Sequence, residues 1–192
     1  MIVFLSGLSG VGKTTTARAF VTRQQQFKHI IASDLISGAG ASIEPADERE
    51  VIRNQNILVQ EFAGFRQYFR DYHLLLDGHM VIETSKGDYI IGDEVIDGLA
   101  VTHFVGIIDN PSRIHSTRRV TQKGAISFFE LAKLQTLEMS VTRQQAERTR
   151  RPFFQVPSGQ VESMEDSLGL AHQAIENILQ PPRPVWRLRR LL

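Results

Sequence analysis

Residues 2–16, IVFLSGLSGVGKTTT, restrict the fold of this chain more than any other stretch. We expect Ile2 to Ser6 to form a short buried strand, because this run is apolar and holds two β-branched residues. A Gly-x-x-x-x-Gly-Lys-Thr pattern begins at Gly7, and this is the P-loop, or Walker A, pattern. The motif requires a strand before it and a helix after it. Both are predicted here, which argues against a glycine-rich turn with a chance Lys-Thr pair.

The residue types of this loop suit a nucleoside triphosphate. Glycines accept positive φ angles and carry no Cβ, so backbone N–H groups converge on a phosphate, and the next helix adds its N-terminal dipole. Lys13 would reach the β and γ phosphates, and the Thr14 hydroxyl would bind Mg²⁺. The motif therefore predicts ATP and Mg²⁺ as cofactors. The loop residues expected to hold ATP are Gly7, Ser9, Gly10, Val11, Gly12, Lys13, Thr14 and Thr15.

Strands and helices alternate along the rest of the chain. Further strands are predicted over 29–32, 73–77, 102–108 and 152–157. Helices are predicted over 14–26, 45–71, 92–99, 111–122, 126–150 and 163–179, and a loop over 83–91. This alternation predicts an α/β fold, the three-layer P-loop NTPase fold, in which helices flank a five-stranded parallel sheet with strand order 2-3-1-4-5.

Length and composition favour one domain. The chain has 192 residues, of which 42% are hydrophobic, and no cysteine, so disulfides and thiolate metal sites are excluded. The net charge of +1 does not favour nucleic acid as a partner. The chain begins with the predicted strand and contains no apolar run long enough to span a bilayer, so we expect a cytoplasmic protein.

Charge is unevenly distributed. Residues 31–100 contain 13 acidic and 5 basic residues, whereas residues 110–151 contain 9 basic and 3 acidic ones. This asymmetry predicts a basic face for a polyanionic substrate, although solvated helix faces account for at least half of these charges. The tail, 181–192, has four arginines and no acid. It is either a surface for a protein or RNA partner or a loosely docked end.

Two aspartates follow predicted strands, where the carboxyl ends of parallel strands face the ligand crevice. Asp34 would act as general base or bind an acceptor hydroxyl, or it would cap a helix, and these roles are compatible. Asp77 resembles the Walker B acid, which supports Mg²⁺ through water. His79 would contact a phosphoryl group or orient a water, unless it is a structural histidine.

Cations are expected near the phosphates. Arg49 and Arg53 lie one helical turn apart and would hold an acceptor phosphate, unless they are simply solvated. Arg118 and Arg119 lie in an arginine-bearing helix that would stabilise charge on the transferred phosphoryl group. Ser158 follows the last predicted strand, where the adenine would lie against backbone.

The order of four features resembles the nucleoside monophosphate kinase group. These are the P-loop, the Asp34 turn, the Leu-Leu-Asp-Gly-His sequence that ends at His79, and the arginines before Gly124. The resemblance is closest to archaeal-type adenylate kinases and to the eukaryotic nuclear adenylate kinase that also serves as a ribosome-assembly factor. It covers residues 1–180 as a P-loop kinase domain, with an acceptor-binding segment over 35–72 and a short lid over 118–127.

The resemblance implies phosphoryl transfer from MgATP to AMP or a similar monophosphate. Arg118 or Arg119, together with Lys123, would be the lid cations, and Arg119 would also contact ATP. Asp34 and the helix that carries Arg49 and Arg53 would face the acceptor. The lid is very short and has Lys123 where an arginine is expected, a departure from the family pattern.

Two other functions fit the sequence. One is a kinase of a hydroxyl group, on a small molecule or a polynucleotide end, with Asp34 as the base. The other is an ATP-dependent switch or assembly factor with slow ATPase activity, which the basic tail suggests.

Overall fold

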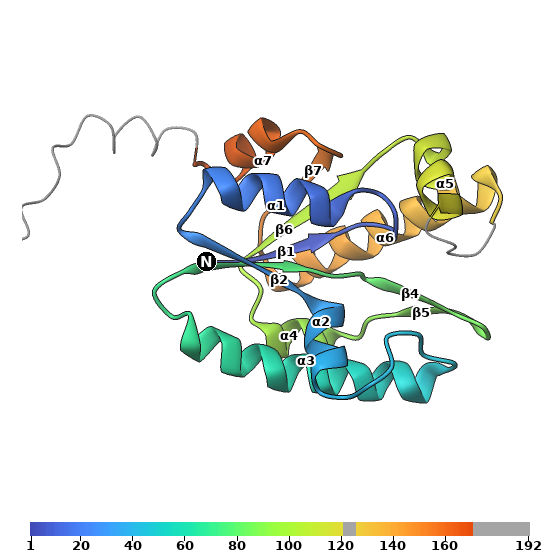
Figure 1. Ribbon diagram of the computed structural model, residues 1–192, viewed down its shortest axis with the longest axis horizontal. Coiled ribbons are helices and arrows are strands. Elements are labelled where there is room, and N and C mark those ends of the chain that lie inside the picture. Colours follow the sequence, from blue (N-terminus) through green and yellow to red (C-terminus); the bar gives the residue numbers. More distant parts are fainter. Residues whose placement is uncertain (121–125, 171–192) are drawn as a thin grey trace, which may run out of the picture.

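The computed structural model describes residues 1–120 and 126–170. A five-stranded sheet forms its centre, with strand order β2-β3-β1-β6-β7 and every neighbouring pair parallel. A separate two-stranded sheet pairs β4 with β5. In chain order the strands are β1 (Ile2–Ser6), β2 (Phe27–Ile31), β3 (His73–Asp77), β4 (Val81–Thr84), β5 (Gly87–Ile90), β6 (His103–Ile108) and β7 (Phe153–Pro157). The predicted α/β fold and order of sheet strands are confirmed (Figure 1).

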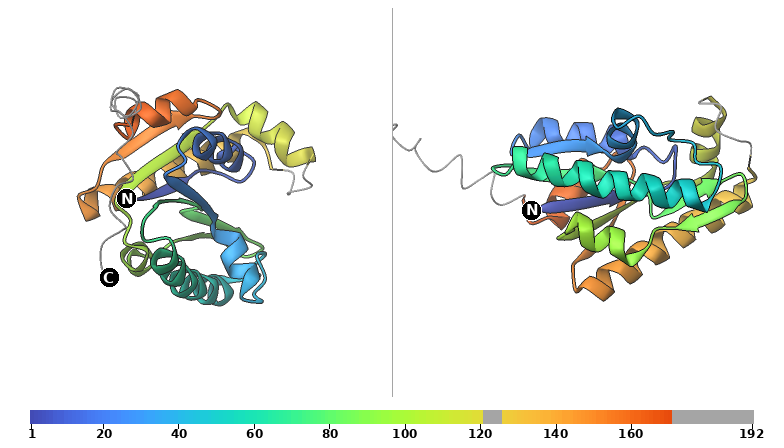
Figure 2. Two further views of the ribbon diagram at one scale, coloured as in Figure 1. Left: turned by 60° about the vertical axis from the view of Figure 1, so that its left-hand side comes forward. Right: turned by 90° about the horizontal axis from the view of Figure 1, so that it is seen from below.

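Helices cover both faces of the main sheet, which makes three layers (Figure 2). They are α1 (Lys13–Arg23), α2 (Ala32–Gly38), α3 (Glu48–Tyr68), α4 (Asp93–Leu99), α5 (Pro111–Val120), α6 (Phe128–Thr149) and α7 (Val161–Ser167). Of the described part of the chain, no helix is both long and apolar enough to cross a membrane.

The two faces of β1 feed two hydrophobic cores, because successive side chains of a strand point to opposite sides. Phe4 packs in the core that includes residues of α3 and α4, whereas Val3 and Leu5 pack in the core that includes residues of α1 and α7. Val3 and Leu5 are fully buried. β1 therefore runs through the middle of the molecule and delivers the loop after Ser6 to the carboxyl edge of the sheet.

Some predicted boundaries were wrong. The predicted loop over 83–91 instead contains the hairpin β4–β5, in which Val81 pairs with Ile90 and Thr84 with Gly87. The strands are short and rich in polar residues, so the apolar periodicity of a strand is weak there. α2 begins directly after β2, so no loop separates them.

Part of the predicted organisation lies outside the described residues. These parts are Lys123, the centre of the predicted lid, residues 171–179 of the helix predicted over 163–179, and the basic tail. Within the described residues that helix prediction was wrong, because α7 ends at Ser167 and Gly169 has a φ of 68° that interrupts the helix.

Candidate active site

The P-loop joins β1 to α1 with three glycines at positive φ: Gly7 at 147°, Gly10 at 84° and Gly12 at 97°. A Cβ on Gly7 would lie 2.7 Å from the Ile107 carbonyl oxygen, and one on Gly12 would collide with the Ser158 hydroxyl. Glycine is therefore required at both positions for steric reasons as well as for backbone conformation. The first turn of α1 contains no acidic residue, which leaves its positive N-terminus available to an anion.

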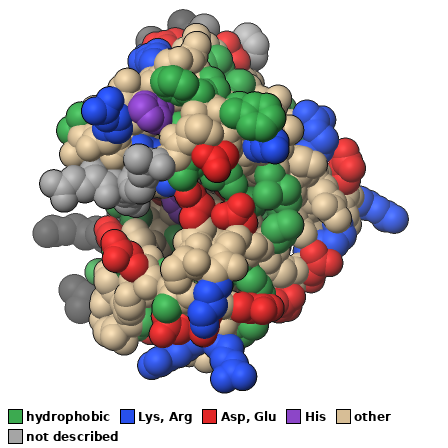
Figure 3. Space-filling model, turned by 90° about the vertical axis from the view of Figure 1, so that its right-hand side faces the viewer, with side chains coloured by type: hydrophobic (Ala, Val, Ile, Leu, Met, Phe, Trp, Pro, Cys, Tyr) green, Lys and Arg blue, Asp and Glu red, His purple; other side chains and the backbone are tan. Residues whose placement is uncertain are grey.

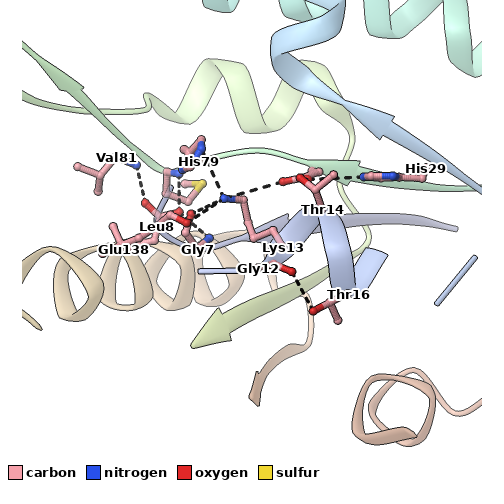
Figure 4. A network of polar contacts seen from close by, with 12 residues as sticks. Gly7, Leu8, Gly12, Lys13, Thr14, Thr16, His29, His79, Val81 and Glu138 are labelled. Carbon is pink, nitrogen blue, oxygen red and sulfur yellow. Dashed lines mark hydrogen bonds and ion pairs between the residues drawn. The ribbon is translucent and has the colours of Figure 1, made fainter. Parts of the chain in front are cut away.

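Lys13 lies at the centre of the loop, and its side chain is buried (Figure 4). Its ammonium donates hydrogen bonds to the carbonyl oxygens of Gly7, at 2.8 Å, and Leu8, at 3.2 Å. His79 Nε2 lies 3.4 Å from the same nitrogen, and an Asp77 carboxylate oxygen lies 3.9 Å from it. The structure thus brings the predicted Lys13, Asp77 and His79 together around one point.

Thr14 and Asp77 form the second part of the site. The Thr14 hydroxyl donates a 2.6 Å hydrogen bond to Asp77 Oδ2, and His29 Nε2 lies 3.6 Å from that oxygen. Burial alone raises the pKa of the Asp77 carboxyl, but the nearby His29, the charge of Lys13 and the Thr14 hydrogen bond outweigh burial, so the pKa falls below its usual value. An ionised carboxylate beside a hydroxyl suits Mg²⁺, which takes oxygen ligands and keeps waters and phosphate oxygens for its remaining positions.

A cavity of about 660 Å³ extends from the P-loop under the sheet edge. Its phosphate end is formed by loop residues together with α5 and the turn after β7. The lining residues there are Ser9, Gly10, Val11, Gly12, Lys13, Thr14, Thr15, Asp77, His79, Asp109, Arg113, Thr117 and Ser158. The other end is formed by α2, α3, α4 and the hairpin, and we call it the acceptor half. Its lining residues are Phe4, Ile31, Ala32, Ser33, Ile36, Ile43, Pro45, Val51, Asn54, Gln55, Leu58, Gly78, Ile82, Ile91, Val95, Ile96 and Leu99.

The mouth of the site lies on the face where the P-loop, the hairpin and α5 meet. Figure 3 shows this face, with acidic side chains near its centre and most lysines and arginines nearer its rim. Arg113 of α5 lines the cavity and lies 3.5 Å from Asp109, so its charge is partly balanced there.

Six predicted site residues are absent from the described lining of this cavity: Gly7, whose N–H donates to Glu138, Arg118, and four exposed residues. Asp34, Arg49, Arg53 and Arg119 are exposed, and none of them is among the described residues that line it. Asp34 lies in the first turn of α2, whose N-cap is Ile31, so the alternative prediction that Asp34 caps the helix is wrong. Because α2 starts without a loop, the helix turns its neighbour Ser33 toward the cavity instead.

Arg118 is buried, in contrast to a lid cation that reaches a phosphate. Its guanidinium donates two hydrogen bonds to the Glu83 carboxylate, at 2.9 and 2.7 Å, in a bidentate pair. Glu83 belongs to β4, so the pair ties α5 to the hairpin. Arg118 Cγ is also packed against Gly10, at 3.0 Å from the Cβ position of that residue. Arg118 thus lies beside the P-loop, but its guanidinium is paired with the Glu83 carboxylate.

Sequence reasoning missed a buried carboxylate, Glu138 of α6, which is 0% exposed. It accepts backbone hydrogen bonds from Gly7 at 3.0 Å, Met80 at 2.9 Å and Val81 at 2.8 Å (Figure 4). Burial raises the pKa of Glu138, and the N–H groups and Lys13 oppose this only in part. The carboxylate therefore locks the start of the P-loop to the segment that follows β3. Glu138 lies in a helical stripe with Leu134, Val141 and Gln145, and a charge in such a stripe is the only sequence signal for it.

Comparison with known families and with curated proteins gives no match to this chain. Among solved structures, the chain is similar to shikimate kinase from Acinetobacter baumannii in complex with shikimate. The TM-score is 0.58 at 14% identity, over 93% of this chain and 95% of that one. It is also similar to the tunicamycin resistance protein of Deinococcus radiodurans, with a TM-score of 0.52 at 12% identity, over 90% of this chain and 94% of that one. At such identities the likeness shows the shared fold.

Proposed function

We propose that this protein is an ATP-dependent kinase that transfers a phosphoryl group to a hydroxyl group of a small molecule. One observation supports this above all: a single cavity joins the P-loop, with Lys13, Thr14 and Asp77, to a second compartment of organic-molecule size. The fold shared with shikimate kinase agrees with the proposal. A switch protein would need the phosphate end of this cavity alone.

The proposed chemistry depends on positioning and charge. The P-loop N–H groups and the α1 N-terminus hold the triphosphate, and Lys13 neutralises charge that develops on the γ-phosphoryl group. Thr14 and Asp77 would hold Mg²⁺, which would neutralise charge on the phosphates. The acceptor oxygen bonds to the γ-phosphorus while the bond from that phosphorus to the β–γ bridging oxygen breaks. ADP leaves, and the proton of the acceptor hydroxyl passes to solvent.

The acceptor compartment favours an alcohol over the AMP-like acceptor implied by the family resemblance. Nucleoside monophosphates need cations for their phosphate, yet Arg49 and Arg53 are exposed and do not line the described cavity. Asp34, the base in the hydroxyl-kinase prediction, also lies outside the lining. A loose phosphoryl-transfer transition state needs little assistance from a general base, so the proposed reaction does not require Asp34.

The test is a coupled assay of ADP release from MgATP with purified protein. The acceptor panel contains neutral alcohols, sugars, nucleosides, 5′-hydroxyl oligonucleotides, and AMP, CMP, GMP and UMP. We expect acceptor-dependent turnover with at least one hydroxyl compound and a loss of about 10²-fold or more in Lys13→Ala. The Lys13→Ala protein should keep the wild-type circular dichroism spectrum.

Two outcomes would contradict this proposal. A response only to a nucleoside monophosphate would favour the adenylate-kinase-like reaction that the family resemblance implies. Slow ADP release that no acceptor accelerates would favour the nucleotide-dependent switch. Residues 181–192 would then be the predicted binding site for a protein or RNA partner.

A further inference from the structure

The acceptor half of the cavity is strongly apolar. Most of its wall consists of aliphatic side chains from five separate elements, and several of them belong to the main hydrophobic core beside α3. Those core members are Ile36, Val51, Leu58, Ile91, Val95, Ile96 and Leu99. Ile43, on the segment between α2 and α3, also lines the cavity although 56% of it is exposed. A bound apolar molecule would cover this otherwise solvated side chain, and burial of apolar surface favours such binding.

The acceptor half also offers no countercharge to an anion. Among the described residues that line the whole cavity, the only lysine and arginine are Lys13 and Arg113, and both lie at the phosphate end. A carboxylate or phosphate placed between α3 and α4 would lose its hydration without gaining a cation, which is strongly unfavourable. The compartment is therefore built for an uncharged molecule.

The apolar lining also contains a polar side chain, Gln55. Gln55 of α3 is only 8% exposed and lines the cavity. Its amide makes no hydrogen bond with any other group within residues 1–120 and 126–170. Its neighbour Asn54 differs, because the Asn54 amide donates a 2.7 Å hydrogen bond to the Ser42 carbonyl oxygen and so holds the segment before α3.

No amide atom of Gln55 is both fully buried and unpaired, so the amide is open to the cavity, where a polar group of a ligand can bind it. The amide of Gln55 offers both donors and an acceptor, so it suits a neutral carbonyl, amide or hydroxyl group. Its position on α3, among Val51 and Leu58, places that polar contact inside otherwise apolar surroundings.

From these observations we infer that the acceptor is a neutral, predominantly apolar alcohol, and that Gln55 recognises a second polar group of that molecule. This inference rests on the proposed function, which it deepens by naming the acceptor class. Gln55 is a specificity-determining residue in this arrangement, and the reacting hydroxyl lies toward Lys13 and Asp77 at the other end of the cavity.

The experiment uses pairs of acceptors on one scaffold. Each pair consists of a neutral apolar alcohol that carries an amide and the same alcohol with a carboxylate in place of the amide. A third analogue carries a methyl group there. With the wild-type protein we expect phosphorylation of the amide compound, with kcat/KM at least about tenfold above that of the carboxylate compound.

The variant Gln55→Leu tests the residue itself, and Leu suits its apolar surroundings. We expect KM for the amide compound to rise about tenfold with little change in kcat, and KM for the methyl compound to stay within about twofold. The matched control is Gln60→Leu, which changes an exposed glutamine of the same helix and should behave as wild type.

The outcomes separate this inference from the proposed function. Preference for the carboxylate compound overturns the inference and leaves a hydroxyl kinase, whereas a response only to a nucleoside monophosphate overturns the proposed function as well. Equal effects of Gln55→Leu and Gln60→Leu overturn the role of Gln55. If MgATP binds but no hydroxyl compound is phosphorylated, the proposed function itself fails, and the inference fails with it.

Discussion

Two aspartates with the same expectation from sequence occupy different places in the structure. Asp77 is 4% exposed, accepts a hydrogen bond from the Thr14 hydroxyl and lies near Lys13. Asp34, in contrast, is exposed on the first turn of α2. A carboxylate can act in catalysis only where it reaches the metal, the phosphates or the acceptor. The local environment of each residue therefore decides between them.

Asp77→Asn and Asp34→Asn form a matched pair of variants. Because Asp77 would support Mg²⁺ through water, we expect its loss to lower kcat by about 10–100-fold and to raise the Mg²⁺ concentration needed for half-maximal rate. Asp34→Asn should stay within about twofold of wild type. Steady-state rates over a Mg²⁺ titration check both. A loss of activity in Asp34→Asn equal to that in Asp77→Asn would show that Asp34 does reach the acceptor.

At the scale of elements, two contacts tie the parts of the site together. Glu138 joins α6 to the P-loop and to the segment after β3, and the Arg118–Glu83 pair joins α5 to the hairpin β4–β5. Each contact links segments far apart in sequence: 131 residues for Glu138 and Gly7, and 35 for Arg118 and Glu83. They place the loop, the hairpin and α5 around one cavity.

Glu138→Gln should lower the free energy of unfolding near neutral pH by about 1–3 kcal/mol, because an amide NH₂ cannot accept the hydrogen bonds that the carboxylate accepts. The pKa of Glu138 is raised by burial above its ordinary value of 4.5, so the folded state binds this proton more tightly than the unfolded state does. The contribution of Glu138 to stability is then largest below pH 4.5 and falls as the pH rises through the raised pKa.

Urea unfolding of wild type and Glu138→Gln between about pH 4 and 8 measures this dependence. The difference in unfolding free energy should shrink as the pH rises through that window, since residue 138 titrates in the wild type and not in the variant, whereas the other titratable groups are common to both. Glu147→Gln, an exposed position on the same helix, is the control. A difference that grows with pH would mean that the backbone N–H groups hold the pKa of Glu138 below its ordinary value.

For the whole molecule, the site is also a source of stability. Residues of β1, α1 and β3 line the cavity together, so a ligand bound there would contact all three elements. Anything that binds the folded state alone stabilises it by mass action. At 100 times its Kd, MgATP should add about 2.7 kcal/mol to the free energy of unfolding.

Thermal unfolding with and without MgATP checks this prediction. The wild-type midpoint should rise with MgATP concentration, because the nucleotide binds only the folded loop. GTP, CTP and UTP at equal concentration show how far the base contributes. If no nucleotide shifts the midpoint, the P-loop of this protein does not bind triphosphate with useful affinity.

The P-loop, the five sheet strands and their parallel arrangement were all predictable from the sequence, because they depend on local signals: glycine spacing, apolar runs and their periodicity. Lys13, Thr14, Asp77 and His79 were predictable for the same reason, since they lie at the carboxyl ends of strands or in the loop itself. The directions of Asp34 and Arg49 depend on helix phase against the sheet, and only the tertiary structure decides them. The role of Glu138 comes from contacts between distant segments, and no local pattern records which buried polar group will meet which partner. Gln55 lines the cavity only because tertiary packing places α3 beside it.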